Sequence, residues 1–122
     1  MSKNKSILVI DDDKYILSVF FKILSKQGFT VENAETGQEA MEMSAKKQYD
    51  LALIDVKLPD IEGPLLVEKM HKKNPDMMKI VITGFPSIED ANKVMDNGAI
   101  AYLVKPIKSE ELVKFINKTL YK

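Results

Sequence analysis

The residues with the clearest potential for chemistry are acids that follow apolar runs. Asp55 ends one such run, and the adjacent acids Asp11, Asp12 and Asp13 follow the aliphatic run at residues 7–10. A short apolar run that stops on a carboxylate is typical of a buried strand that reaches the rim of a sheet. Adjacent carboxylates repel one another, so they either project into water or hold a cation. Because neither histidine nor thiol accompanies them, they suit Mg²⁺, with Mn²⁺ as the alternative.

Two further polar side chains end apolar runs later in the chain. Thr83 and Lys105 supply a hydroxyl and an ammonium group. A divalent cation and an ammonium can share the charge of an incoming phosphoryl group, which is most of what phosphoryl transfer requires. We therefore predict that Asp55 is a nucleophile that forms an acyl phosphate, with Thr83 donating a hydrogen bond to the phosphoryl group. The backbone carbonyl of Lys57 is the predicted third metal ligand.

The chain alternates between short apolar runs and helical patterns. Thr36, Ser87, Ser109 and Asp13 are the predicted N-caps of four helices. The predicted strands are residues 7–10, 29–34, 51–55, 79–83 and 101–104, and the predicted helices are 14–27, about 36–46, 65–73, 87–97 and 109 to about 121.

Strict alternation of five strands and five helices requires parallel strand pairing. We predict an α/β fold with one domain over residues 1–122, a flavodoxin-like doubly wound three-layer sandwich with strand order 2-1-3-4-5. In that order the first and third strands are neighbours. Asp11 and Asp12 should therefore lie beside Asp55, and Thr83 and Lys105 should reach the same rim.

Composition excludes several classes of function. Lys and Arg number 18, Asp and Glu number 18, and there is no cysteine. The chain therefore offers no basic surface for nucleic acid, no disulfide framework and no thiolate metal site. The polar start leads into too few apolar residues for a signal peptide or a membrane span, so we expect a cytoplasmic protein with no membrane partner.

Four motifs in order resemble a response regulator receiver domain of the CheY-like superfamily: ILVIDDD, LALIDVKLPDIEG, VITG and AYLVKP. The resemblance covers essentially the full chain and implies a role in two-component or phosphorelay signalling. It implies that Asp12 binds the metal directly and Asp11 binds it through water. It also implies that Asp55 is the phosphoacceptor and that Lys105 assists the transfer, with a cis peptide bond before Pro106.

The same resemblance implies a switch. Thr83 is its expected hydroxyl and Tyr102 its expected aromatic residue, and together they should alter the face formed by the fourth helix, fifth strand and fifth helix. Expected partners are a histidine kinase or a histidine phosphotransfer protein, and a downstream effector or C-terminal output domain. The sequence at residues 98–102 lacks the Asp-Asp-Tyr signature of OmpR/PhoB-like transcription factors. We expect a monomer or weak dimer.

Other residues suggest partner binding and control of lifetime. Leu17 and Phe21 form a second apolar stripe on the first helix, which we interpret as a contact for the partner, although plain apolar surface is an alternative. The resemblance implies that Lys57 and Phe85 tune access of hydrolytic water, so we predict slow self-dephosphorylation. His71, the only histidine, is predicted to be exposed.

Three rival functions remain open at this stage. A flavodoxin shares the architecture, but three acids in its first loop would repel a flavin phosphate. A haloacid-dehalogenase-like phosphatase would use Asp11 as its nucleophile, yet the chain lacks that family's late acidic pair. A receiver-like adaptor would bind partners without phosphorylation. We do not expect a conventional enzyme, only a protein that catalyses its own phosphorylation and dephosphorylation.

Overall fold

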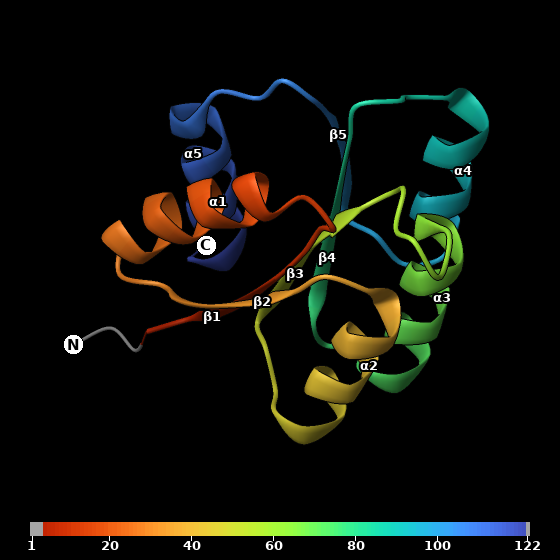
Figure 1. Ribbon diagram of the computed structural model, residues 1–122, viewed down its shortest axis with the longest axis horizontal. Helices are drawn as coiled ribbons and strands as arrows, with labels where there is room; N and C mark the ends of the chain where they lie inside the picture. The colour runs from red at the N-terminus through yellow and green to blue at the C-terminus, as the bar shows by residue number, and fades with distance from the viewer. Residues whose placement is uncertain (1–3, 122) are drawn as a thin grey trace.

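A five-stranded parallel sheet forms the centre of the computed structural model, which describes residues 4–121 (Figure 1). The sheet order is β2-β1-β3-β4-β5, as predicted. The strands are β1 (Ser6–Ile10), β2 (Thr30–Ala34), β3 (Leu51–Asp55), β4 (Met78–Thr83) and β5 (Ala101–Val104). The helices are α1 (Lys14–Lys26), α2 (Gly37–Lys46), α3 (Gly63–Lys73), α4 (Ile88–Asp96) and α5 (Ser109–Leu120).

The helices cover both faces of the sheet. Figure 1 shows α1 and α5 on one side and α2, α3 and α4 on the other. The residues of β1 alternate between two core clusters, with Ile7 and Val9 facing α1 and α5 and Leu8 and Ile10 facing the other layer. All four are at most 1% exposed. Burial on both faces explains why this strand is an unbroken aliphatic run.

Three of the four predicted helix caps are confirmed. The side chains of Asp13, Thr36 and Ser87 each accept a hydrogen bond from a backbone amide two or three residues later. The prediction for Ser109 is wrong. Ser109 is the first residue of α5, and the preceding Lys108 takes the N-cap position without a side-chain hydrogen bond. The peptide bond between Lys105 and Pro106 is cis, as expected.

Strand β4 carries a lysine that the sequence pattern did not identify as buried. Lys79 is 0% exposed, and burial lowers its pKa. Its Nζ donates to the carbonyl oxygen of Asn74 at 2.6 Å and lies 3.1 Å from Nδ1 of His71. The prediction that His71 is exposed is therefore wrong, because its ring is partly buried between Lys79 and Gly98. Among residues 4–121, no helix is long and apolar enough to cross a membrane.

Candidate functional site

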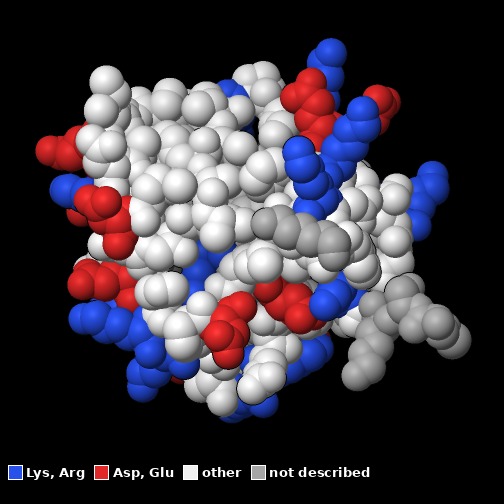
Figure 2. Space-filling model, turned by 180° about the vertical axis from the view of Figure 1, so that it is seen from behind, with Lys and Arg blue, Asp and Glu red and all other residues white. Residues whose placement is uncertain are grey.

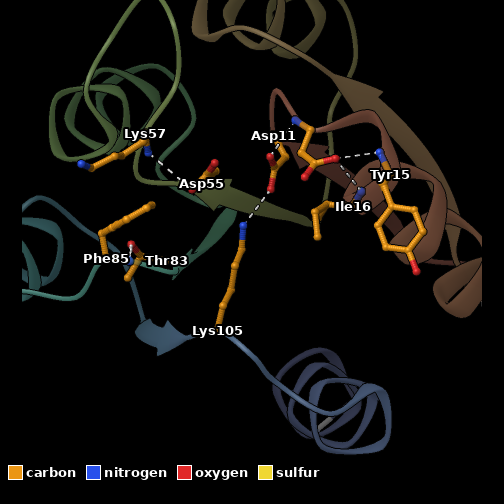
Figure 3. A network of polar contacts seen from close by, with 9 residues as sticks. Asp11, Tyr15, Ile16, Asp55, Lys57, Thr83, Phe85 and Lys105 are labelled. Carbon is orange, nitrogen blue, oxygen red and sulfur yellow. Dashed lines mark hydrogen bonds and ion pairs between the residues drawn. The ribbon is translucent and has the colours of Figure 1, made fainter.

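Four strands bring polar side chains to one rim of the sheet. Figure 3 shows Asp55 at the tip of β3, Asp11 beyond β1, and Lys105 extending from the end of β5 towards Asp11. Asp11, Asp12 and Asp55 each offer a carboxylate oxygen, and these oxygens lie within 4.8 Å of one another. The predicted convergence of the strand ends is confirmed. Its physical cause is that neighbouring parallel strands end on the same side of the sheet.

The carboxylates differ in their environments. Asp11 is 4% exposed, and its two oxygens accept hydrogen bonds from Lys105 Nζ at 3.2 Å and from the Asp13 amide at 3.0 Å. Asp12 is exposed, whereas Asp55 is partly buried. Burial and the nearby charge of Asp11 raise the pKa of Asp55 to about 6, although Lys105 and the Lys57 amide act in the opposite direction.

The chemistry of this donor set fits a hard divalent cation. Three carboxylates face one ammonium group, so negative charge at the rim is only partly balanced by the protein. Burial is the main cause of the raised pKa of Asp55, and the charge of Asp11 adds to it. Oxygen ligands without nitrogen or sulfur are those that Mg²⁺ and Mn²⁺ prefer. Asp11, Asp12 and Asp55 are the residues that could hold such an ion.

The two predicted switch residues contact the same segment of the β4–α4 loop. Thr83 is fully buried, and its Oγ1 accepts a hydrogen bond from the Phe85 amide at 2.9 Å. Tyr102 is partly buried, and its hydroxyl oxygen accepts a hydrogen bond from the Ser87 amide at 3.1 Å. The loop between these amides therefore depends on hydroxyl groups from β4 and β5.

The loop after β3 is closed at its base. The Gly63 amide donates to the Val56 carbonyl at 2.8 Å, and Lys57 and Glu62 form an isolated antiparallel bridge. A Cβ atom at Gly63 would lie 2.7 Å from the Val56 Cα, so this close approach requires glycine. Within the loop, the Lys57 amide lies 3.4 Å from Asp55 Oδ1.

Asp60, at the tip of this loop, is a residue that sequence reasoning missed. Its two carboxylate oxygens accept hydrogen bonds from the amides of Gly37 and Gln38, each at 2.9 Å. These hydrogen bonds lower the pKa of Asp60. In the sequence, Pro59-Asp60 is an ordinary turn pattern. Its partners are 22 and 23 residues away, so no local signal identifies them.

The sequence model of the family described as "Response regulator receiver domain" matches residues 7–117. The chain belongs to this family. The receiver domain is similar to the transcriptional regulatory protein ZraR of Escherichia coli K12, with 30% identity over 117 residues. That match covers 96% of the receiver domain and 26% of ZraR, so the chain spans about a quarter of this relative's length.

Comparison with solved structures also finds receiver domains. The receiver domain is similar to a CheY-like receiver domain protein from Methanospirillum hungatei JF-1, with 41% identity, a TM-score of 0.95 and coverage of 97% and 94% of the two chains. It is also similar to the beryllofluoride-activated NtrC4 receiver domain dimer, with 30% identity, a TM-score of 0.89 and coverage of 94% and 95%.

The predicted contact stripe on α1 of the receiver domain needs a correction. Phe21 is 45% exposed, but Leu17 is 4% exposed and belongs to the core cluster between the sheet and the helices α1 and α5. Leu17 therefore cannot present its side chain to a partner. The helix contacts both the sheet and α5, so its buried stripe is wider than one helical face.

A second apolar surface of the receiver domain lies around α4 and β5. Figure 2 shows a broad area without charged side chains on the side behind the view of Figure 1. The exposed large apolar side chains on or next to these two elements are Phe85, Ile88, Met95, Ile100 and Val104. The site and this surface meet in the β4–α4 loop, which contains Phe85.

Proposed function

We propose that this receiver domain accepts a phosphoryl group on Asp55 from a phosphohistidine of a histidine kinase or a histidine phosphotransfer protein. The observation that carries the proposal is the cluster of Asp11, Asp12 and Asp55 oxygens within 4.8 Å, with Lys105 Nζ 3.2 Å from Asp11. A bound cation and the Lys105 ammonium together would offset the negative charge of these acids, so that a phosphoryl group can approach Asp55.

The residues that would hold Mg²⁺ are carboxylates and one carbonyl. Asp12, Asp55 and the backbone carbonyl of Lys57 are the proposed direct ligands, and Asp11 is proposed to act through water. When bound, the ion supplies positive charge for the phosphoryl oxygens at this rim. Lys105 supplies a second positive charge from the end of β5, and its Nζ already lies 3.2 Å from Asp11 Oδ2.

The transfer needs only one bond to form and one to break. A carboxylate oxygen of Asp55 forms a bond to phosphorus, while the bond between phosphorus and the histidine nitrogen of the donor breaks. The electron pair of the broken bond remains on the imidazole nitrogen. In self-dephosphorylation a water oxygen forms a bond to phosphorus while the bond between phosphorus and the Asp55 oxygen breaks. Inorganic phosphate leaves, a proton of the water is released, and the Asp55 carboxylate is regenerated.

The switch follows from the hydroxyl groups that hold the β4–α4 loop. Thr83 now accepts from the Phe85 amide, so reorientation of its hydroxyl towards a phosphoryl oxygen would release that amide. The loop would then move, and Tyr102 would lose its contact with Ser87. The α4-β5-α5 face changes as a result, with a coupling free energy of about 1 to 3 kcal/mol.

The biological setting is part of the same proposal. A cytoplasmic location suits a domain whose donor is a kinase, and the partners are that kinase or phosphotransfer protein and either a downstream effector or a C-terminal output domain. The chain is proposed to be a monomer or weak dimer. ZraR, of which the match covers 26%, is a transcriptional regulatory protein.

The test is phosphorylation by a small donor. Purified protein with acetyl phosphate should gain one phosphoryl group only when Mg²⁺ is present, and Mg²⁺ with beryllofluoride should shift the amide resonances of Thr83 and Tyr102. Asp55→Asn should abolish both effects. An unlabelled wild-type protein would favour the adaptor alternative. Label that persists on Asp55→Asn and is lost on Asp11→Asn would favour the phosphatase-like alternative.

A further inference from the structure

The contact between Asp60 and α2 joins two loops that are far apart in sequence. Asp60 lies in the loop that follows the proposed phosphoacceptor, and its carboxylate takes the first two amides of α2, from Gly37 and Gln38. The first amides of a helix lack intrahelical acceptors and carry partial positive charge. A two-oxygen contact with a carboxylate therefore satisfies both amides and fixes the direction of the Asp60 side chain.

This contact is not the only cap of α2. The helix already has its own N-cap in Thr36, whose Oγ1 accepts from the Glu39 amide at 3.0 Å. The approach of the two loops is also close, because a Cβ atom at Gly37 would collide with the side chain of Ile61. Gly37 therefore lies where the tip of the loop meets the helix, and Asp60 lies where the first two amides of α2 can donate.

The loop has a second fixed point at its base. The hydrogen bond between Gly63 and Val56 and the bridge between Lys57 and Glu62 close it there. The main chain at Lys57 lies at this base, and its amide faces Asp55. A loop held at both base and tip cannot rotate as a hinge about the base alone, so the contact at the tip limits motion of the main chain at Lys57.

We propose that Asp60 is a positioning residue for the cation site, because it holds the loop of residues 56–62 against the N-terminus of α2 and so fixes the main chain at Lys57 beside Asp55. This inference rests on the proposed function, in which the Lys57 carbonyl is a metal ligand. Groups that orient metal ligands commonly change metal affinity by about 10- to 100-fold when they are removed.

The experiment compares Asp60→Ala with Thr36→Ala. Both variants remove acceptors from the first turn of α2, but only Asp60→Ala releases the loop. Mg²⁺ is titrated against the ¹⁵N-labelled full chain, and the dissociation constant is read from the amide resonances of Asp55 and Lys57. We expect Asp60→Ala to weaken Mg²⁺ binding by about tenfold and Thr36→Ala to leave it within about twofold of wild type.

Two further measurements sharpen the comparison. Hydrogen exchange at the Gly37 and Gln38 amides should accelerate in Asp60→Ala and report the lost contact without any metal. Asp60→Asn keeps one acceptor oxygen, so its Mg²⁺ affinity should lie between those of wild type and Asp60→Ala. If Asp60→Ala does not fold, Asp60→Asn is compared with Thr36→Ala in its place.

The outcomes separate this inference from the proposed function. Equal Mg²⁺ affinity in wild type and Asp60→Ala, or equal weakening in Asp60→Ala and Thr36→Ala, would overturn the positioning role while phosphorylation of Asp55 stands. A wild-type protein that neither binds Mg²⁺ nor takes label from acetyl phosphate would overturn both.

Discussion

Lys105 and Asp11 form an ion pair in which Nζ lies 3.2 Å from Oδ2, and the two side chains are only 26% and 5% exposed. The pair joins the end of β5 to the end of β1, across 94 residues of sequence. Without a cation, Lys105 is the positive charge closest to this nearly buried carboxylate. A divalent ion bound at the proposed site would therefore share Asp11 with the ammonium.

Lys105→Met tests this competition. The methionine keeps an apolar stem of similar length but removes the charge, so Mg²⁺ should bind about three- to tenfold more tightly. Transfer from acetyl phosphate should become slower, because one of the two positive charges on the phosphoryl group is lost. Lys108→Met is the control, since Lys108 is exposed and close in sequence. Weaker Mg²⁺ binding in Lys105→Met would contradict the competition.

The raised pKa of Asp55 predicts a pH-dependent gain in stability for Asp55→Asn. In the metal-free folded protein the pKa is about 6, whereas an unfolded aspartate titrates near about 4. Folding therefore favours the protonated acid, and stability falls as pH rises from about 4 to about 6. Asparagine does not ionise, so the variant lacks this penalty.

Urea unfolding in the presence of a chelator measures the effect. Above pH 6 we expect Asp55→Asn to be more stable than wild type by about 1 to 2 kcal/mol, because solvent screens part of the charge on this half-buried carboxyl, and below pH 4 the gain should disappear. A stability difference that stays constant from pH 4 to pH 8 would show that ionisation of Asp55 is not its cause.

The rim could be predicted from the sequence because it depends on strand ends alone. Once strands are parallel and their order is known, a residue that directly follows an apolar run has one possible location, and this argument places Asp55, Thr83 and Lys105. Contacts made by loops follow no such rule. The partners of Asp60 lie on a different loop, and only the folded chain brings them together.

The burial of two side chains could not be predicted from the sequence pattern. Leu17 belongs to the core cluster under α1, and this helix contacts both the sheet and α5, so a single stripe of apolar residues underestimates the buried surface. Lys79 occupies a buried strand position because its long apolar stem fills the core while its amine reaches the Asn74 carbonyl.

Lys57 and Phe85 predict a long phosphoryl lifetime. The Lys57 ammonium lies 4.5 Å from the centroid of the Phe85 ring, and the ring is 66% exposed. We predict that this pair covers one approach of water to Asp55. An exposed cation–π contact is worth about 0.5 to 1 kcal/mol, so Lys57→Asn with Phe85→Ala should shorten the lifetime about two- to fivefold.

The two single variants provide the control for this pair. If Lys57 and Phe85 act as one unit, either substitution alone should shorten the lifetime nearly as much as both together. Loss of label from Asp55 after removal of the donor measures the rate. An unchanged lifetime in the double variant would refute the shielding.

Phe21 is the remaining candidate for partner contact on α1. Phe21→Ser should slow transfer from the cognate kinase or phosphotransfer protein about tenfold, because an exposed aromatic residue is a common anchor at interfaces. Labelling by acetyl phosphate should not change. Tyr121→Ser is the matched control, since both side chains are 45% exposed. Equal slowing in the two assays would show that Phe21 acts on the site or the fold rather than on the partner.

The glycines that end α1 and α4 predict different costs for the same substitution. Gly28 and Gly98 have φ angles of 97° and 118°, so alanine is strained at both positions. A Cβ atom at Gly28 would meet open space, whereas one at Gly98 would collide with the ring of His71. Gly28→Ala should cost about 1 kcal/mol of unfolding free energy, and Gly98→Ala about 3 kcal/mol.

His71→Ala separates strain from collision. Removal of the ring should recover about 1 kcal/mol or more of the cost of Gly98→Ala, measured as the coupling in a double-mutant cycle by urea unfolding. His71→Ala also removes the contact between His71 and Lys79. The single variant His71→Ala measures that loss of stability, and the cycle subtracts it. The same cycle between His71→Ala and Gly28→Ala should show no coupling. Equal losses of unfolding free energy for Gly28→Ala and Gly98→Ala would show that the α4–β5 turn or the His71 ring moves aside at no measurable cost.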